Sequence, residues 1–380
     1  MTIIGIILGL LILSLLVTIH ESGHYIAAKR AGVVVEEFAI GMGPLAWSKK
    51  LNNGTLFSIR WLPIGGFCKM KGENDADRKK GSYGSTTFWQ KTKILFAGVM
   101  LNWTAAAVVF TILALVGLPK VIDNPISVAS DTNTILSPVT VSYISPDTPA
   151  EKAGLAVGDE IISIAGEQIT VASKLSEVTS DKKGESVQII YRRGGTEETA
   201  SAELRSDNSD KKGYLGVAPF QSSYIKATWS APVVGVGATL QLTVETFKGV
   251  GKMAGDFFGG LAKQVSLDAE TRKSGQESIG EASNNVAGPV GIIGVIFPSA
   301  AQSGAITLLF LAGVISLSLA VMNILPIPAL DGGRWLLTAI FKVTKRPLTK
   351  EIEERVVTAG FLLLMGLVIL ITIVDVTRII

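Results

Sequence analysis

Cysteine and histidine are the two residue types that this sequence has least of. Its 380 residues include a single cysteine, Cys68, which excludes an intramolecular disulfide, so any exported part must be stabilised by its own core. The formal net charge of +3 is too small to indicate a nucleic-acid partner. The N-terminus lacks the basic start and the small-residue cleavage site of a secretory signal peptide. We therefore expect residues 3–25 to be retained as a membrane helix.

Long apolar runs, by contrast, are abundant. Hydrophobic residues make up 48% of the chain and the mean hydropathy is +0.43, which favours a membrane-embedded protein. Runs of about 20 apolar residues predict four transmembrane helices. They are Ile3–His24, Ile94–Leu118, Ile306–Leu325 and Val356–Val374.

Lysine and arginine are concentrated in two of the loops between these helices. Twelve of them lie between the first and second predicted spans, and six lie between the third and fourth. Because basic loops stay in the cytoplasm, both loops are predicted to be cytoplasmic. Both termini and the segment from Pro119 to about Gly304 are then predicted to be outside.

The only two histidines, His20 and His24, end the first predicted span. They are four residues apart, so they share one face of a helix, where both can bind one metal ion. Glu21 then lies beside the metal, in position to accept a proton from water. The alternative is a polar helix end that spells this pattern by chance. We favour the metal site, because ionisable residues at membrane depth are costly and usually functional.

Asp331 follows the third predicted span, which also runs from outside to inside. It therefore reaches the same side of the membrane as the histidines, where it can be the third ligand of an open catalytic zinc site. Pro326 and Pro328 interrupt the helix before it and free the backbone to turn. The alternative is that Asp331 only caps the next helix.

Two motifs in these segments resemble the site-2 protease family of intramembrane zinc metalloproteases. His20-Glu21-Ser22-Gly23-His24 is similar to its first zinc motif, and the stretch NILPIPALDG, residues 323–332, is similar to its second. The resemblance implies a bacterial inner (plasma) membrane protein that is mainly α, with four transmembrane helices, a membrane-associated β-hairpin or sheet and an extracytoplasmic PDZ-like α/β domain. It also implies Zn²⁺-dependent cleavage, near the cytoplasmic side, of single-span membrane proteins such as anti-sigma factors, after another protease has trimmed them.

The residues alone are also consistent with two other classes of protein. A non-enzymatic scaffold would bind exported peptides through its external domain, and a metal transporter would use the histidines and Asp331 to pass ions. The scaffold leaves His20, Glu21, His24 and Asp331 without a role. We expect a lipid bilayer around the chain and no nucleic acid, and the sequence predicts no particular oligomeric state.

Three further positions are candidates for substrate contact through the same resemblance. The family has a Gly-x-Gly stretch that dips into the membrane as a β-hairpin beside the active site, and Gly41 and Gly43 are similar to it. Leu62–Phe67 also resembles a family segment near the site, although a plain turn fits it equally well. Asn102, four residues after Gly98 in the second span, resembles a Gly/Asn element thought to face substrate; the alternative is an amide that only joins helices.

The segment Val139–Gly216 predicts a small α/β domain. Pro149 begins a short helix that Gly154 ends, and strands on either side of Gly194-Gly195 predict a hairpin. The segment resembles a bacterial PDZ domain in circularly permuted order. Tyr214, Leu215 and Gly216 are similar to the carboxylate-binding loop of such domains. The domain could bind a new C-terminus or act as a size filter.

Residues 227–300 are the hardest to interpret. An apolar stripe that begins at Leu240 and ends at Leu261 predicts a helix. A fifth span would separate Asp331 from the histidines, so we interpret this segment as an amphipathic surface helix. The resulting division of the chain is 1–118, 119–225 for the PDZ-like domain, 226–303 for the surface helix and connector, and 304–380.

Overall fold

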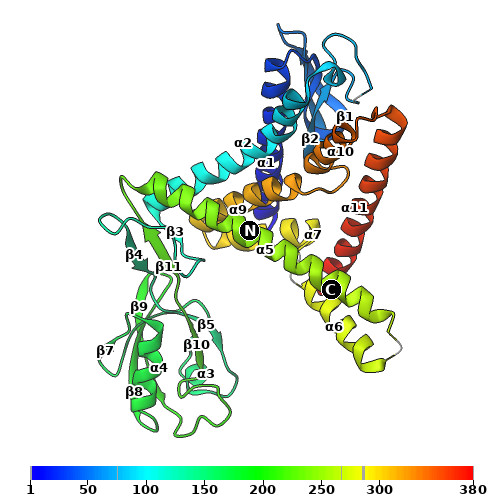
Figure 1. Ribbon diagram of the computed structural model, residues 1–380. Helices are drawn as coiled ribbons and strands as arrows, with labels where there is room; N and C mark the ends of the chain where they lie inside the picture. The colour runs from blue at the N-terminus through cyan, green and yellow to red at the C-terminus, as the bar shows by residue number, and fades with distance from the viewer. Residues whose placement is uncertain (1, 75, 267, 285–286, 380) are drawn as a thin grey trace. The chain divides into compact units, whose positions relative to one another are not determined.

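The computed structural model describes residues 2–74, 76–266, 268–284 and 287–379 (Figure 1). The chain forms two compact units, each described by itself. The helical unit comprises Met1–Ala114, Pro125–Val128 and Trp229–Ile380, and the PDZ-like unit comprises Leu115–Asn124 and Ala129–Thr228.

The helical unit contains the four predicted apolar helices. They are α1 (Thr2–Arg30), α2 (Phe88–Val116), α9 (Ala305–Ile324) and α11 (Lys350–Ile379). Within the described part of the chain, these four are the helices long and apolar enough to cross a membrane. Helix α2 begins six residues before the predicted span because Thr87 and Gln90 form a capping box. The Thr87 N–H donates to Gln90 Oε1 at 2.9 Å, and the Gln90 N–H donates to Thr87 Oγ1 at 3.3 Å.

Two long strands, β1 (Val35–Lys50) and β2 (Leu56–Met70), form the sheet of this unit, here called the bent sheet. Residues 37–40 pair with residues 66–69 on one side and with residues 56–59 on the other, and residues 45–50 pair with residues 56–60. Each strand therefore reverses direction near its middle. Gly41, at φ +83°, permits the first reversal, since a Cβ there would lie 2.5 Å from the Leu62 carbonyl oxygen. Leu62–Phe67 thus contains the reversal of β2 and leads into the segment that pairs with residues 37–40, so it combines a change of direction with strand pairing.

Short helices complete the path to the last two spans. The chain passes through α7 (Pro289–Gly291), η2 (Ile292–Ile296) and α8 (Phe297–Gln302), which together are apolar but too short to cross a membrane. The sequence predicts only a break at Gly288–Gly291. The ring of Phe297 is fully buried against Gly9 of α1, because that glycine leaves room for it. Helix α10 (Asp331–Val343) then connects α9 to α11.

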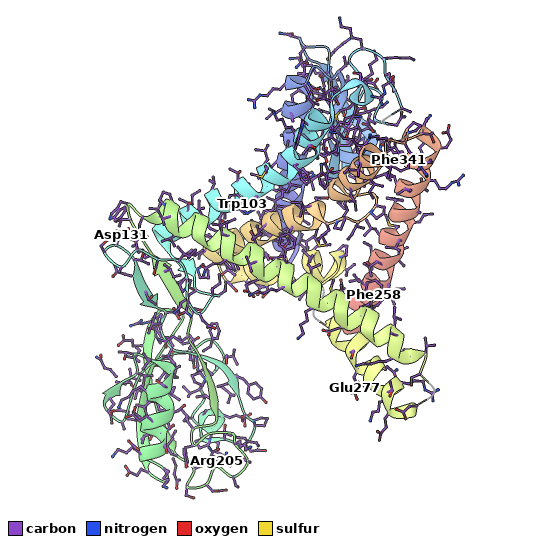
Figure 2. All side chains as sticks on the ribbon, in the orientation of Figure 1. Trp103, Asp131, Arg205, Phe258, Glu277 and Phe341 are labelled. Atoms are coloured by element: carbon purple, nitrogen blue, oxygen red, sulfur yellow. The ribbon has the colours of Figure 1, made fainter. Side chains whose placement is uncertain are left out.

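The segment predicted as an amphipathic surface helix forms one long helix, α5 (Ala231–Gln264), followed by α6 (Ala269–Asn284). Trp103, labelled in Figure 2, joins α2 to α5 by donating its Nε1–H to Thr243 Oγ1 at 3.1 Å. Helix α5 is not among the candidate spans in the described residues. Its stripe includes exposed apolar side chains such as Leu240 and Val244, as an amphipathic surface helix requires. Its attachment to a membrane stays a prediction.

The PDZ-like unit is built on a sheet with the strand order β10-β5-β6-β8-β9. In chain order its elements are β5 (Thr140–Ile144), α3 (Pro149–Lys152), β6 (Glu160–Ile164), β7 (Glu167–Gln168), α4 (Ala172–Asp181), β8 (Ser186–Arg193), β9 (Thr196–Glu203) and β10 (Val217–Phe220). A small second sheet of β3 (Leu118–Pro119), β11 (Ser223–Lys226) and β4 (Asn133–Leu136) accompanies it. The predicted helix at Pro149 and the hairpin around Gly194-Gly195 are confirmed.

The loop before β10 contains Tyr214, Leu215 and Gly216. The Leu215 side chain is 2% exposed in the core, and its carbonyl accepts the Ala150 N–H at 2.9 Å. No hydrogen bond from the N–H groups of Tyr214, Leu215 or Gly216 occurs among the residues that the structure describes. N–H groups that are not used within the fold are what a carboxylate-binding loop offers. A substrate role for this loop stays a prediction.

Gly216 provides a test of this loop. It has φ +87°, and a Cβ there would lie 2.2 Å from Thr148 Cβ, whereas Gly166 has φ +81° and no atom within 4 Å of such a Cβ. We expect Gly166→Ala to cost about 1–2 kcal/mol through its backbone alone. Gly216→Ala should cost about 1–3 kcal/mol more, because Thr148 must also move. Hydrogen exchange of the β5 and β10 amides measures both losses, and equal losses would contradict the steric argument.

Candidate metal centre

The two histidines and Asp331 converge at one point of the helical unit. His20 Nε2 lies 3.1 Å from His24 Nε2 and 3.1 Å from Asp331 Oδ2, and His24 Nε2 lies 3.3 Å from the same oxygen. His20 and His24 are 8% and 6% exposed. The structure therefore brings together the three ligands that the sequence predicts.

This spacing fits a tetrahedral zinc site. Ligand atoms about 2.0–2.1 Å from zinc are separated by about 3.3 Å along the edges of a tetrahedron. His24 Nδ1 lies 2.8 Å from the Ile94 carbonyl oxygen and can only donate to it, so in a neutral ring Nε2 carries the lone pair. That lone pair faces a carboxylate oxygen and a second imidazole nitrogen. One metal cation would be bound by all three of these atoms at once, and the residues present therefore fit zinc.

Asp331 reaches the histidines through a tightly packed loop. Ala329 has φ +80°, which turns the chain sharply before α10 begins at Asp331. Gly332 packs so closely on the end of α9 that a Cβ would lie 2.1 Å from the Ile324 carbonyl oxygen. Gly333 packs equally closely on Ile327. Asp331 is thus the first residue of α10, whose N-cap is Leu330, and its carboxylate is directed at the histidines instead of capping the helix as the alternative requires.

Close approach of α2 to α1 encloses the two rings. A Cβ on Gly98 would lie 2.7 Å from His24 Nε2 and 2.8 Å from His20 Cε1, and one on Gly23 would lie 2.3 Å from the Ala97 carbonyl oxygen. The sequence marks Gly98 only as part of the Gly/Asn element and gives no sign of the contact with the Ile94 carbonyl. The small residue inside the His-Glu-Ser-Gly-His motif is the one signal in the sequence for this approach.

The bent sheet passes beside Glu21. A Cβ on Gly66 would lie 3.8 Å from Glu21 Cγ and 3.7 Å from Val17 Cγ1. Gly41 and Gly43 lie at the reversal of β1, where their neighbours are residues of the β2 reversal such as Leu62. Gly66, rather than Gly41 or Gly43, is thus the sheet glycine in contact with the motif helix.

An ion pair between Arg60 and Glu37 connects segments of the bent sheet near its reversals. Arg60 donates to Glu37 Oε1 at 2.7 Å and to the Gly43 carbonyl at 2.8 Å, while its guanidinium lies 5.0 Å from the centre of the Phe67 ring. Burial raises the pKa of the Glu37 carboxyl, but hydrogen bonds from Ser58 and Arg60 outweigh it and hold that pKa below its usual value. Glu37 is therefore an anion at neutral pH, and the pair is ionic.

Asn102 is fully buried in α2, one turn beyond Gly98. Ser316 of α9 donates its hydroxyl to the Asn102 backbone carbonyl at 2.9 Å. The substrate role predicted for Asn102, like the roles of Gly41 and Gly43, is not tested by these contacts. Tyr214, Leu215 and Gly216 belong to the PDZ-like unit and contribute nothing to this cluster.

Apolar spanning helices with a His-Glu-x-x-His motif and a converging carboxylate define a membrane metalloprotease. The sequence model of peptidase family M50 matches residues 8–367, and the chain belongs to that family, the site-2 proteases. A protein of Clostridium perfringens named as a zinc metalloprotease is 32% identical over 371 residues, with 98% of each chain covered. Zinc metalloprotease RasP of Geobacillus kaustophilus is 27% identical, with 99% of each chain covered. The predictions of the enzyme class and of zinc are thereby confirmed.

One comparison with solved structures concerns the PDZ-like unit. The PDZ domain of an SdrC-like protein from Listeria monocytogenes matches 25% of this chain and 93% of that domain, at 25% identity and a TM-score of 0.20.

Gly98→Ala tests the enclosure of the rings. The added methyl group must displace both imidazoles, so we expect zinc affinity to fall by an order of magnitude or more, the range of changes next to metal ligands. Gly366→Ala in α11 is the matched control, since no atom lies within 4 Å of the added carbon. Competition with a chelator on purified protein measures both. Wild-type affinity in Gly98→Ala would show that α2 does not shape the site.

Proposed function

We propose that this enzyme hydrolyses peptide bonds within the transmembrane segments of single-span membrane proteins. The observation that carries the proposal is the convergence of His20, His24 and Asp331 at the ends of two apolar helices, with Glu21 in the same motif. A scaffold has no use for this convergence. The site lies among spanning helices, so its substrates are peptide bonds that reach the same depth.

The ligand residues and Glu21 have separate roles in the reaction. His20, His24 and Asp331 would hold zinc, which polarises a carbonyl and makes water more acidic when it is bound. Glu21 accepts a proton from the attacking water and delivers it to the nitrogen of the leaving amine. His24 stays oriented throughout, because Ile94 anchors its Nδ1.

The bent sheet supports the proposal for substrate binding. A helical substrate hides its carbonyls in hydrogen bonds, so it must unwind before cleavage. Residues 66–69 form one outer segment of the sheet, with Gly66 beside Glu21 and the Cys68 backbone hydrogen-bonded to the Glu21 carboxylate. An extended substrate would pair along the rest of this edge, next to the catalytic base. Met42, Trp61, Leu62 and Ile64 at the reversals are exposed and apolar, which suits contact with lipid or with a hydrophobic substrate.

We propose a bacterial inner-membrane protein with both termini and the PDZ-like unit outside and the metal centre near the cytoplasmic side. The distribution of basic residues supports this orientation. The proposed substrates are proteins such as anti-sigma factors that another protease has already trimmed outside.

Glu21→Gln separates chemistry from metal binding. The variant keeps the shape of the side chain but cannot accept the proton, so cleavage should fall by at least about 10²–10⁴-fold while zinc content stays at the wild-type level. His24→Ala, the control, should lose both zinc and cleavage. The measurements are metal content and cleavage of a reconstituted single-span substrate. An active Glu21→Gln enzyme would place the base elsewhere.

Cysteine labelling tests the orientation. Cysteines introduced at Lys79 and Arg346 should react only with reagents that reach the cytoplasm, and one at Asp181 should react from outside. Native Cys68 gives little background, because burial raises the pKa of its thiol to about 12 and leaves it protonated. Labelling of positions 79 and 346 from opposite sides would contradict a single site shared by Asp331 and the histidines.

A further inference from the structure

The two ligand histidines differ in how their second nitrogen is held. His24 Nδ1 contacts the Ile94 carbonyl oxygen at 2.8 Å, whereas His20 Nδ1 is buried and has no hydrogen-bond partner within the described residues. A metal-binding histidine normally donates its other N–H to an oxygen, which fixes the tautomer and the ring orientation. His20 therefore lacks a contact that its role requires.

The side chain of Asn102 also lacks hydrogen-bond partners, and it contains the acceptor oxygen that His20 lacks. Its side chain is 0% exposed, and within the described part of the chain neither Oδ1 nor Nδ2 has a hydrogen-bond partner. Leaving a buried polar group without a hydrogen bond is energetically costly. Packing between helices does not explain this cost, because an apolar side chain of similar size would avoid it.

Gly98 lies beside His20 and one helical turn before Asn102. A Cβ on Gly98 would lie 2.9 Å from His20 Nδ1, so that nitrogen faces α2 at this turn. Asn102 is four residues further along α2, where Cβ positions are about 5–6 Å apart. Helical side chains lean toward the N-terminus of their helix, which directs Asn102 toward Gly98. The missing side chain of Gly98 leaves the space between them for the amide or for one water molecule.

We propose that Asn102 is a positioning residue of the metal centre, whose Oδ1 accepts the Nδ1–H of His20 directly or through one water molecule. The contact holds the His20 Nε2 lone pair toward Asp331 and the other imidazole. Helix α2 then orients both ligand histidines, His24 through the Ile94 carbonyl and His20 through Asn102. This inference rests on the proposed function, and it replaces the substrate contact that the sequence suggested for Asn102.

Zinc affinity distinguishes the two roles of Asn102. Asn102→Leu should weaken zinc binding by about 10–100-fold, the usual cost of removing such a partner. Asn102→Asp keeps an acceptor oxygen and should bind zinc as the wild type does. Ser316→Ala is the matched control, because it removes a hydrogen bond to the same residue without touching the amide. Chelator competition with zinc alone is the readout. Unchanged affinity in Asn102→Leu, with a raised KM for substrate, would overturn the inference in favour of substrate binding.

A spectroscopic measurement requires no stable variant. The chain has two histidines, so nitrogen-15 labelling of histidine gives four ring nitrogens to assign. In the zinc-bound wild-type protein both rings should carry a proton on Nδ1, and the His20 Nδ1–H should show the downfield shift and slow exchange of a hydrogen bond to oxygen. A His20 Nδ1–H without that shift would overturn the inference. Loss of zinc binding by the wild type would instead contradict the proposed function.

Discussion

The structure depends on holding two imidazoles and one carboxylate in contact among apolar helices. Three ligand atoms within 3.3 Å of one another present lone pairs to a common point, and this arrangement is unfavourable without a cation. The ligands come from α1 and from the start of α10, which are more than 300 residues apart in the chain. Metal binding therefore links the first and third apolar helices, and its free energy also stabilises their packing.

Small residues provide the close packing that this convergence needs. Helices in lipid gain little from hydrophobic burial, so they associate where small side chains allow their backbones to approach. Gly23 brings α1 onto α2 at Ala97, and Gly360 brings α11 onto the Pro328 loop, where a Cβ would lie 2.3 Å from the Pro328 carbonyl oxygen. The catalytic geometry is thus set by backbone contacts, which vary less than contacts between flexible side chains.

The sequence predicts well the four long apolar helices and the three side chains that the structure brings together, because apolar runs and the ionisable residues at their ends are easily recognised. The sequence is a poorer guide to the ends of helices and to short segments, where local packing and hydrogen bonds determine the structure. The start of α2 at Phe88 depends on two polar side chains that hydropathy counts against a helix. The apolar stretch Pro289–Gln302 is too short to be read as a span, although Phe297 packs into the surface of α1 at Gly9.

The groups that contact the ligand side chains also cannot be predicted from the sequence. A backbone carbonyl such as that of Ile94 leaves no trace in residue identities, and Gly98 is significant only once α1 and α2 are known to cross there. The bent sheet shows the same limit. The resemblance predicts a β-hairpin or sheet around Gly41 and Gly43, but not the pairing of residues 37–40 with two different segments of β2, because that pairing is a tertiary property.

All the atoms that shape the metal centre belong to the helical unit. The ligands, the Ile94 carbonyl, Gly98 and Asn102 lie either before residue 115 or after residue 228, on the two sides of the PDZ-like unit in the sequence. The PDZ-like unit has its own core, from Val139 to Leu215, and supplies no ligand atom. The metal chemistry therefore does not depend on contacts with the PDZ-like unit. The sequence of the PDZ-like unit can change without disturbing the positions of His20, His24 and Asp331, which depend on contacts among α1, α2 and the α9–α10 loop.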